Sequence, residues 1–220
     1  MSDLQVYGNI VSQPTRSVLT FLKLSNISYQ FNSLDFTKGE HLTPEFARIN
    51  PYQTMPAILH DGHNVWESPA IVSYIAAVYN TDNQWYPKDP RVRSRIDAYF
   101  HWHHQGVREP CMNYLRAKVL GPKLMGLPEL TDEQEAPLRA RFIELLDDIK
   151  WHIASTGYVA RTTTPSIADV FAFNEVAALR RLYNLDEHAE VKAWFEQIAA
   201  ITEVQELRAQ AQENILKILG

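Results

Sequence analysis

Strand patterns in this chain are concentrated near its N-terminus, and helical patterns dominate the remaining residues. Segments with strand character lie at residues 4–7, 29–34, 54–59 and 64–67. Helical periodicity then covers residues 91–118, 132–155, 166–182, 187–201 and 203–219. This order predicts a mixed domain over residues 1–80, a proline-containing linker over 81–90 and an all-helical domain over 91–220.

The first strand leads into a helix through Ser12-Gln13-Pro14-Thr15-Arg16. Proline suits the first position of a helix, so Pro14 is expected to start one that runs to Leu24. Ser12 would then lie beside unpaired backbone N–H groups and the positive end of the helix dipole, which together favour an anion. The simpler interpretation, in which Ser12 is only a loop or capping residue, stays open at this point.

Two further features of the mixed domain concern its backbone. Pro56 opens the third strand, and the bond before it is a candidate for the cis form. In that case the Met55 backbone would point outward unpaired, able to bind an extended peptide as an added strand would. Asp61-Gly62 then predicts a tight hairpin turn into an antiparallel strand.

The segment Glu67-Ser68-Pro69-Ala70 repeats the pattern seen at Ser12. Ser68 is expected to cap a helix that Pro69 opens, which would create a second helix N-terminus suited to a carboxylate. A plain capping role is again the alternative. His41, in a polar segment, is either an exposed loop residue or one that faces a ligand-binding cleft.

The first long helix of the second half has two faces. Its predicted core face holds Phe100, Val107, Cys111 and Tyr114, and a neighbouring polar face holds Asp97, His101, His104 and Arg108. The polar face is either solvated or meets an anionic ligand. The histidines of this helix lack acidic or thiol partners at the usual spacing, so no metal is predicted. Further on, Ser166 and Asp169 form a capping-box pattern.

Charge and composition narrow the range of functions. A formal net charge of −5 argues against nucleic acid or an anionic membrane surface as partner. The chain has 1 cysteine, Cys111, and hence no internal disulfide and no Cys-x-x-Cys redox pair. No secretory pattern opens the sequence and no run approaches the ~20 apolar residues of a membrane span, so a cytoplasmic location is expected.

Several motifs, taken in order and spacing, resemble those of the cytosolic glutathione transferases, most closely the theta class and the related delta class. They are Ser12-Gln13-Pro14-Thr15-Arg16, Lys38-Gly39-Glu40-His41-Leu42, Asn50-Pro51, Met55-Pro56-Ala57, Glu67-Ser68-Pro69-Ala70-Ile71, Trp85-Tyr86-Pro87 and the box from Ser166 to Asp169. The resemblance extends over nearly the whole chain. It implies an α/β thioredoxin-like N-terminal domain, an all-α C-terminal domain and a homodimer.

The resemblance also implies roles for single residues, with glutathione as co-substrate. Ser12 resembles the hydroxyl that donates a hydrogen bond to the glutathione sulfur. His41 resembles the residue that reaches the glycyl end, and Met55, before Pro56, resembles the backbone clamp on the cysteinyl unit. Glu67 and Ser68 resemble the pair that holds the γ-glutamyl group. Arg108 resembles an arginine that points into the cleft from the second domain.

The chain departs from the family pattern in two places. Thr54 stands where theta enzymes commonly carry a lysine, so one electrostatic contact to glutathione is in doubt. The chain ends at Gly220, whereas theta chains tend to continue into a segment covering the active site, so a more open apolar site is expected. Tyr7, on the first strand, is the rival of Ser12 as sulfur donor, because other transferase classes use a tyrosine there.

Three other functions stay open alongside conjugation. The first is a non-catalytic binding module, since transferase-like domains also serve in assemblies; the retained Ser12, His41, Glu67 and Ser68 argue against it. The second is thiol–disulfide exchange, for which Ser12 and Thr15 stand in place of the required cysteines. The third is peroxide reduction or dehalogenation with glutathione as the source of the thiol.

Overall fold

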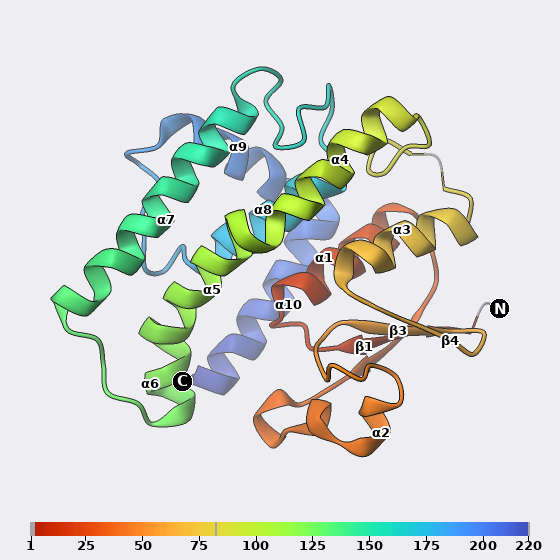
Figure 1. Cartoon of the computed structure of the whole chain (residues 1–220), viewed down its shortest axis with the longest axis horizontal. Helices are drawn as coiled ribbons and strands as arrows, with labels where there is room; N and C mark the ends of the chain where they lie inside the picture. The colour runs from red at the N-terminus through yellow and green to blue at the C-terminus, as the bar shows by residue number, and fades with distance from the viewer. Residues whose placement is uncertain (1–2, 82, 220) are drawn as a thin grey trace. The chain divides into compact units, whose positions relative to one another are not determined.

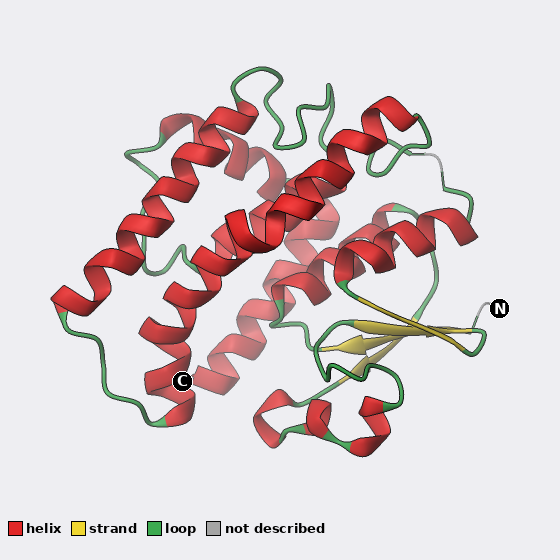
Figure 2. Ribbon diagram, in the orientation of Figure 1, coloured by secondary structure: helices red, strands yellow, loops and turns green. Residues whose placement is uncertain are grey.

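All strands of the described chain lie before residue 67, in one four-stranded sheet (Figure 2). The structure is a computed structural model that describes residues 3–81 and 83–219. The strands are β1 (Leu4–Gly8), β2 (Gln30–Ser33), β3 (Ala57–His60) and β4 (His63–Trp66), in the spatial order β2-β1-β3-β4. β1 and β2 are parallel, while β3 is antiparallel to both β1 and β4.

One face of this sheet packs against α1 (Gln13–Leu24) and, beside it, α3 (Ser68–Val78) (Figure 1). Leu4, Val6 and Gly8 alternate along β1 and are buried on this side. A Cβ atom at Gly8 would lie 2.7 Å from Cγ2 of Thr15, so glycine lets α1 approach the strand closely. The helix begins at Gln13, one residue earlier than expected, and Pro14 therefore occupies its second position.

The opposite face carries shorter helices: η1 (Phe36–Lys38), η2 (Glu40–Leu42) and α2 (Pro44–Ala47). The Phe46 ring lies 6.4 Å from the Tyr7 ring, centroid to centroid. The Thr43 hydroxyl accepts a hydrogen bond from the Phe46 N–H and caps α2. These two layers over a mixed sheet confirm the thioredoxin-like N-terminal fold.

The predicted hairpin turn is confirmed. Asp61 and Gly62 both have positive φ, 48° and 81°, which is the conformation of a two-residue turn that matches the twist of β-strands. The Met55–Pro56 bond is cis.

The second half of the chain is helical, as predicted. Its first helical stretch continues without a break through α4 (Pro90–His103), η3 (His104–Arg108), α5 (Glu109–Leu115), η4 (Arg116–Leu120) and α6 (Gly121–Met125). Segments η3 and η4 are π-helical, and each ends two residues before a proline, Pro110 or Pro122. Because proline lacks an N–H and its ring clashes with the preceding turn, the helix widens there. The sequence did not predict these segments.

The core of the helical half follows the predicted faces. Val107, Cys111 and Tyr114 are buried, as is Phe100. The remaining helices are α7 (Asp132–Ile153), α8 (Ile167–Ala178), α9 (Ala189–Ala199) and α10 (Thr202–Leu219). The capping box at the start of α8 is confirmed, with the Ser166 N–H donating to Asp169 Oδ2 at 2.9 Å.

The chain divides into two compact units, one comprising Met1–Lys88 with Thr202–Ile218 and the other Asp89–Ile201. The C-terminal helix therefore groups with the N-terminal unit, whereas the sequence assigned it to the helical domain. The segment around Tyr86 also packs on this unit, since that side chain is 2% exposed and meets the Phe21 ring edge-on. Within the part of the chain that the structure describes, no helix combines the length and apolarity that crossing a membrane requires.

Candidate functional site

Ser12 lies at the N-cap of α1, with φ −71° and ψ 124°, and its hydroxyl makes no capping hydrogen bond. Its backbone N–H donates to the Asn9 carbonyl at 3.0 Å, and its own carbonyl accepts from the Arg16 N–H. An N-cap serine normally uses its hydroxyl to satisfy the first turn of the helix. Here the hydroxyl of a half-buried serine is left available to a ligand at the positive end of α1.

The loop that leads to Ser12 is held by two side chains whose roles the sequence did not predict. Asn9 donates to the Leu34 carbonyl at 2.8 Å and accepts from the Val11 N–H. Arg16 is 6% exposed, and its Nη1 donates to the carbonyls of Ile10 and Val11 at 3.0 and 2.8 Å. A side chain that folds back from a helix onto the preceding loop leaves no periodic pattern in the sequence. This role of Arg16 therefore could not be predicted.

Tyr7, the rival of Ser12, is directed to the other face of the sheet. Its hydroxyl donates to Oε1 of Gln5 at 2.8 Å, and its ring meets Phe46 of α2. Burial, and secondarily the negative charge of Asp3, raise the pKa of the Tyr7 phenol. The hydroxyl is already engaged as a donor and lies away from the α1 side of the sheet, which favours Ser12.

The Met55 backbone lies just beyond the sheet ladder. β3 begins at Ala57, the last residue that pairs with β1. Asn50, fully buried, holds the preceding residue by donating to the Thr54 carbonyl at 2.8 Å and to the Thr54 hydroxyl at 3.0 Å. The Thr54 hydroxyl thus has an intramolecular partner, while Pro56 is buried at the entrance to the strand.

The start of α3 differs by one residue from the sequence prediction. Glu67, not Ser68, is the N-cap, so the assignment of Ser68 as capping residue is wrong. β4 ends at Trp66, so a single residue must turn the chain from strand to helix, and Glu67 does this with φ 64° and ψ 111°. Ser68 is the first helical residue and is 6% exposed, whereas Glu67 is exposed.

The sheet register brings three of these predicted site segments to one edge. Tyr7 pairs with Ala57, and Ala57 pairs with Trp66. The loop after β1, the Met55 backbone and Glu67 therefore leave the sheet at the same end, and Ser12 and Ser68 follow at the N-termini of α1 and α3. This grouping depends on strand order and could not be read from the sequence.

His41 belongs to η2, within the same unit. Its side chain is half-buried, and its Nδ1 atom is buried without a hydrogen-bond partner among the described residues. Buried polar atoms are nearly always paired, so this nitrogen is suited to a ligand group.

Arg108, in the helical unit, has a partner that the sequence did not predict. Its Nη1 donates to Oε1 of Glu175 at 2.5 Å, and the Glu175 side chain is only 2% exposed. Glu175 lies among apolar residues of α8, where a carboxylate is costly unless it is paired. Over residues 3–81 and 83–219, no group of three or more His, Cys, Asp or Glu side chains is arranged to hold a metal ion.

Comparisons with known proteins identify the family to which the chain belongs. Residues 2–77 match the family model described as the glutathione S-transferase N-terminal domain. The chain is 31% identical to mouse glutathione S-transferase theta-1 over 98% of its own length and 90% of the relative. The chain belongs to the glutathione S-transferase family.

Other glutathione S-transferases extend the match. Glutathione S-transferase T1 of Arabidopsis thaliana is 32% identical over 89% of this chain and 83% of its own. The crystal structure of human glutathione transferase theta-2 in complex with glutathione and an unknown ligand superposes with a TM-score of 0.86 at 28% identity, covering 98% of this chain and 88% of that one. The sequence resemblance to a theta-like transferase is confirmed.

Proposed function

We propose that this chain is a glutathione transferase that joins the glutathione thiolate to electrophilic, apolar substrates. The observation that carries the proposal is the uncommitted Ser12 hydroxyl at the N-terminus of α1, at the same sheet edge as Met55 and Glu67. The theta-class names of the relatives support the same activity.

A hydrogen bond from the Ser12 hydroxyl and the N-terminus of α1 can together supply the free energy needed to stabilise a thiolate. A free thiol has a pKa of about 8.5, and lowering it by about two units requires roughly 2.7 kcal/mol of preference for the charged form. A hydrogen bond to an ionised group contributes about 1.5–3 kcal/mol, and a helix N-terminus about 0.3–1 kcal/mol. The two together reach the required amount without a general base.

The other residues are assigned to binding glutathione. The Met55 backbone next to Pro56 pairs with the cysteinyl unit, and Glu67 and Ser68 receive the γ-glutamyl amine and carboxylate at the start of α3. His41 offers its unpaired Nδ1 to the glycyl end. Thr54 is assigned to the glutathione site because it directly precedes Met55 in the chain.

Arg108 is assigned to glutathione from the helical domain, with its Glu175 partner fixing the orientation of the guanidinium. The domains are assigned accordingly. Residues 1–80 form the domain that binds glutathione, residues 81–90 form the linker, and residues 91–220 form the helical domain that supplies the apolar substrate site.

The reaction balances without an external oxidant or reductant. The thiol proton leaves to solvent on binding, and the thiolate electron pair forms a carbon–sulfur bond with the electrophile. The bond to the leaving group breaks, and that group departs with its electron pair. Ser12 donates a hydrogen bond throughout and gains no covalent bond.

The test compares Ser12→Ala with Ser12→Thr and Tyr7→Phe. Ser12→Ala should lower kcat/KM roughly 10- to 100-fold, because the lost hydrogen bond to a charged sulfur has that value. The pKa of bound glutathione, followed by thiolate absorbance across pH, should rise in this variant. Ser12→Thr keeps a hydroxyl and should retain most activity. Loss of activity in Tyr7→Phe alone would refute the assignment.

A homodimer and a cytoplasmic location are proposed from the same family likeness. Two copies of the 25.3 kDa chain would give a particle of about 51 kDa by light scattering (2 × 25.3). A monomeric mass at micromolar concentration would contradict the dimer. Fractionation of cells that express the tagged chain would test the location.

A further inference from the structure

The Ser12 hydroxyl stands at the end of the Ser12 loop, residues 9–12, which joins β1 to α1. A donor to a thiolate has to stay within about 0.5 Å of one position, and loops hold side chains less precisely than helices or strands do. Among the described residues of α1, none receives a capping hydrogen bond from this hydroxyl. Its position therefore depends on how the backbone of the loop is held.

Asn9 makes three hydrogen bonds that fold the Ser12 loop. Its backbone carbonyl accepts from the Ser12 N–H at 3.0 Å, which closes a turn over residues 9–12. Its side-chain Oδ1 accepts from the Val11 N–H at 2.9 Å, the pattern of an Asx turn. Its Nδ2 donates to the Leu34 carbonyl at 2.8 Å. A single residue thus sets the path of the chain up to Ser12.

Leu34 ties the Ser12 loop to the sheet. It directly follows β2, whose last residue pairs with Gly8, and its N–H donates to the Gly8 carbonyl at 2.8 Å. With Asn9 as donor, the Leu34 carbonyl is paired as well. The Asn9 amide therefore extends the β1–β2 pairing by one hydrogen bond, at the point where the chain leaves β1.

Arg16 holds the same loop from the helix. Its Nη1 donates to the carbonyls of Ile10 and Val11 at 3.0 and 2.8 Å, and its backbone N–H donates to the Ser12 carbonyl at 3.0 Å. The N–H and C=O groups of Val11 and of Ser12 are therefore all paired, through Asn9 and Arg16. The backbone that carries the Ser12 hydroxyl is fixed on both sides.

We infer that Asn9 is a positioning residue for the transferase reaction, which holds the Ser12 hydroxyl in place to donate to the glutathione sulfur. This inference rests on the proposed function, because Ser12 has to be the donor to that sulfur. The Asn9 side chain contacts Val11 and Leu34 and is assigned no contact with glutathione. Without it residues 10–12 can shift, and a displacement of about 1 Å weakens such a contact strongly.

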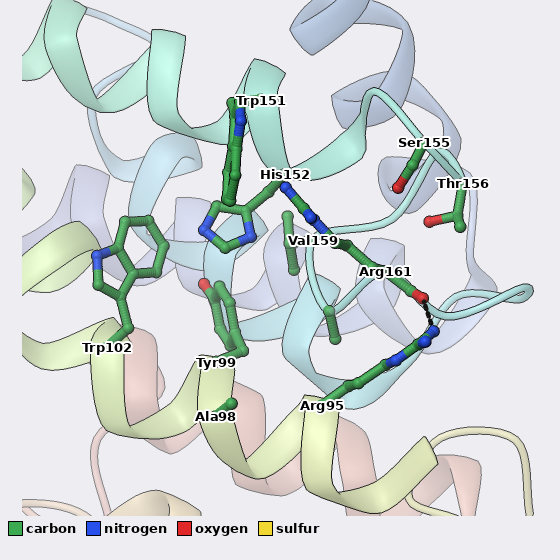
Figure 3. Close-up of a pocket in the computed structure, with 11 residues that line it drawn as sticks. Arg95, Ala98, Tyr99, Trp102, Trp151, His152, Ser155, Thr156, Val159 and Arg161 are labelled. Carbon is green, nitrogen blue, oxygen red and sulfur yellow. Dashed lines mark hydrogen bonds between the residues drawn. The ribbon is translucent and has the colours of Figure 1, made fainter. Parts of the chain in front are cut away.

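A pocket of about 560 Å³ in the helical unit is not part of this arrangement. Figure 3 shows it between α4 and the end of α7 with the segment after it, where Tyr99, Trp102 and Arg161 contribute to its lining. None of its lining residues belongs to the Ser12 loop or to α1. The residues that hold Ser12 all lie in the N-terminal unit, so variants in that unit test the inference without altering the pocket lining.

The test is a double-mutant cycle on the full chain with Asn9→Ala, Ser12→Ala and the double variant. The measured quantity is the pKa of bound glutathione, followed by thiolate absorbance across pH. Asn9→Ala should raise this pKa by about one unit, because a displaced hydroxyl stabilises the thiolate less. In the Ser12→Ala background the same change should have no further effect, since no hydroxyl is left to position. A merely structural role would not produce this difference.

The kinetic signature is a loss of turnover and not of binding. At a pH below both pKa values, kcat should fall about tenfold for a shift of one unit, and the deficit should shrink as pH rises above the raised pKa. KM for glutathione should stay within about twofold, because Met55 and Glu67 are unchanged. Asn9→Asp keeps the acceptor for Val11 and loses the donor to Leu34, so it should act in the same direction. It carries the test if Asn9→Ala does not fold.

Asn32→Ala is the matched control. Asn32 is a half-buried asparagine of β2 whose amide donates to Oε1 of Gln5 and not to the Ser12 loop, so the thiolate pKa should not change. An unchanged pKa in Asn9→Ala, where Ser12→Ala raises it, would overturn the inference and leave the proposed function intact. An equal rise in both backgrounds would also overturn it, because Asn9 would then act without Ser12. An unchanged pKa in Ser12→Ala would refute the proposed role of Ser12 and the inference with it.

Discussion

Glu67 adopts a backbone conformation that residues other than glycine rarely take, with φ 64° and ψ 111° at the N-cap of α3. Strain of this kind costs about 1–3 kcal/mol and persists where the surrounding structure imposes it. Here the one-residue connection between β4 and α3 imposes it, and the same connection presents the Glu67 carboxylate at the sheet edge.

Replacement of Glu67 separates this strain from the loss of the carboxylate. Glu67→Gly and Glu67→Ala both delete the carboxylate, and both should raise KM for glutathione. Only glycine relieves the positive φ, so Glu67→Gly should be more stable than Glu67→Ala by roughly 1 kcal/mol in urea unfolding. Equal stability of the two variants would show that position 67 is not strained.

His103 is a buried histidine that stays neutral. Burial, and after it the positive charges of His104 and Arg108, lower its pKa to about 3. Its Nδ1 lies 3.1 Å from the Tyr99 hydroxyl, and its Nε2 lies 4.0 Å from Oε1 of Glu175. The Glu175 carboxylate would favour protonation, but it is already paired with Arg108.

The consequence is a loss of stability in acid. Below about pH 6.5 the unfolded chain takes up a proton at this histidine, whereas the native state does so only near pH 3, so the stabilisation is complete above pH 6.5 and declines as pH falls. The loss should be on the order of 4 kcal/mol by pH 3. Urea unfolding from pH 7 to 4 should show a shallower pH dependence in His103→Gln. His101→Gln, at an exposed position on the same helix, should match the wild type.

At the scale of elements, α8 is anchored by one buried carboxylate. Asp169 is fully buried and accepts from the Ser166 N–H, the Val159 N–H and Nε1 of Trp194, at 2.9, 2.9 and 3.0 Å. It therefore joins the start of α8 to the preceding loop and to α9. The sequence identified the capping box but gave no indication of the Val159 and Trp194 contacts, which come from distant positions.

Loss of this carboxylate should be costly. Asp169→Ala leaves several buried donors without an acceptor, at about 1–3 kcal/mol each, so we expect a loss of roughly 3–5 kcal/mol in the free energy of unfolding. Near-ultraviolet circular dichroism of Trp194 should change in parallel. Asp186→Ala removes an exposed carboxylate and should cost under about 1 kcal/mol. Comparable losses in the two variants would contradict the anchoring role.

At the scale of the molecule, the last helix belongs to the unit formed by the first 88 residues. Val204, Leu207 and Ala211 of α10 are each 3% exposed, and Glu206 pairs with Lys23 of α1 at 2.8 Å. The N-terminal unit therefore includes a segment from the other end of the chain.

Leu207→Ala should destabilise that unit by roughly 2–4 kcal/mol, because a buried leucine is replaced by a cavity. Hydrogen exchange should accelerate first in β1 and β3, with less change in α7 and α8. Leu216→Ala, at a position 54% exposed on the same helix, is the matched control and should have little effect. Faster exchange confined to the helical unit would refute the grouping.

The features that the sequence predicted correctly depend on residues that lie close together in the chain. Alternation and 3.6-residue periodicity identified most of the strands and helices, Asp61-Gly62 identified the hairpin, and Ser166 with Asp169 identified a helix start, because each depends on residues a few positions apart. The ordered motifs around Ser12, Met55 and Glu67 identified the family.

Tertiary structure decided what these residues face. The pairing of Tyr7 with Ala57 and of Ala57 with Trp66 places three site segments at one edge, and Glu175 reaches Arg108 across 67 positions. The positive φ of Glu67 likewise arises from packing, since a single residue must join β4 to α3. Periodicity reports that a face is apolar or polar, but not which distant segment covers it, so these features required the folded chain.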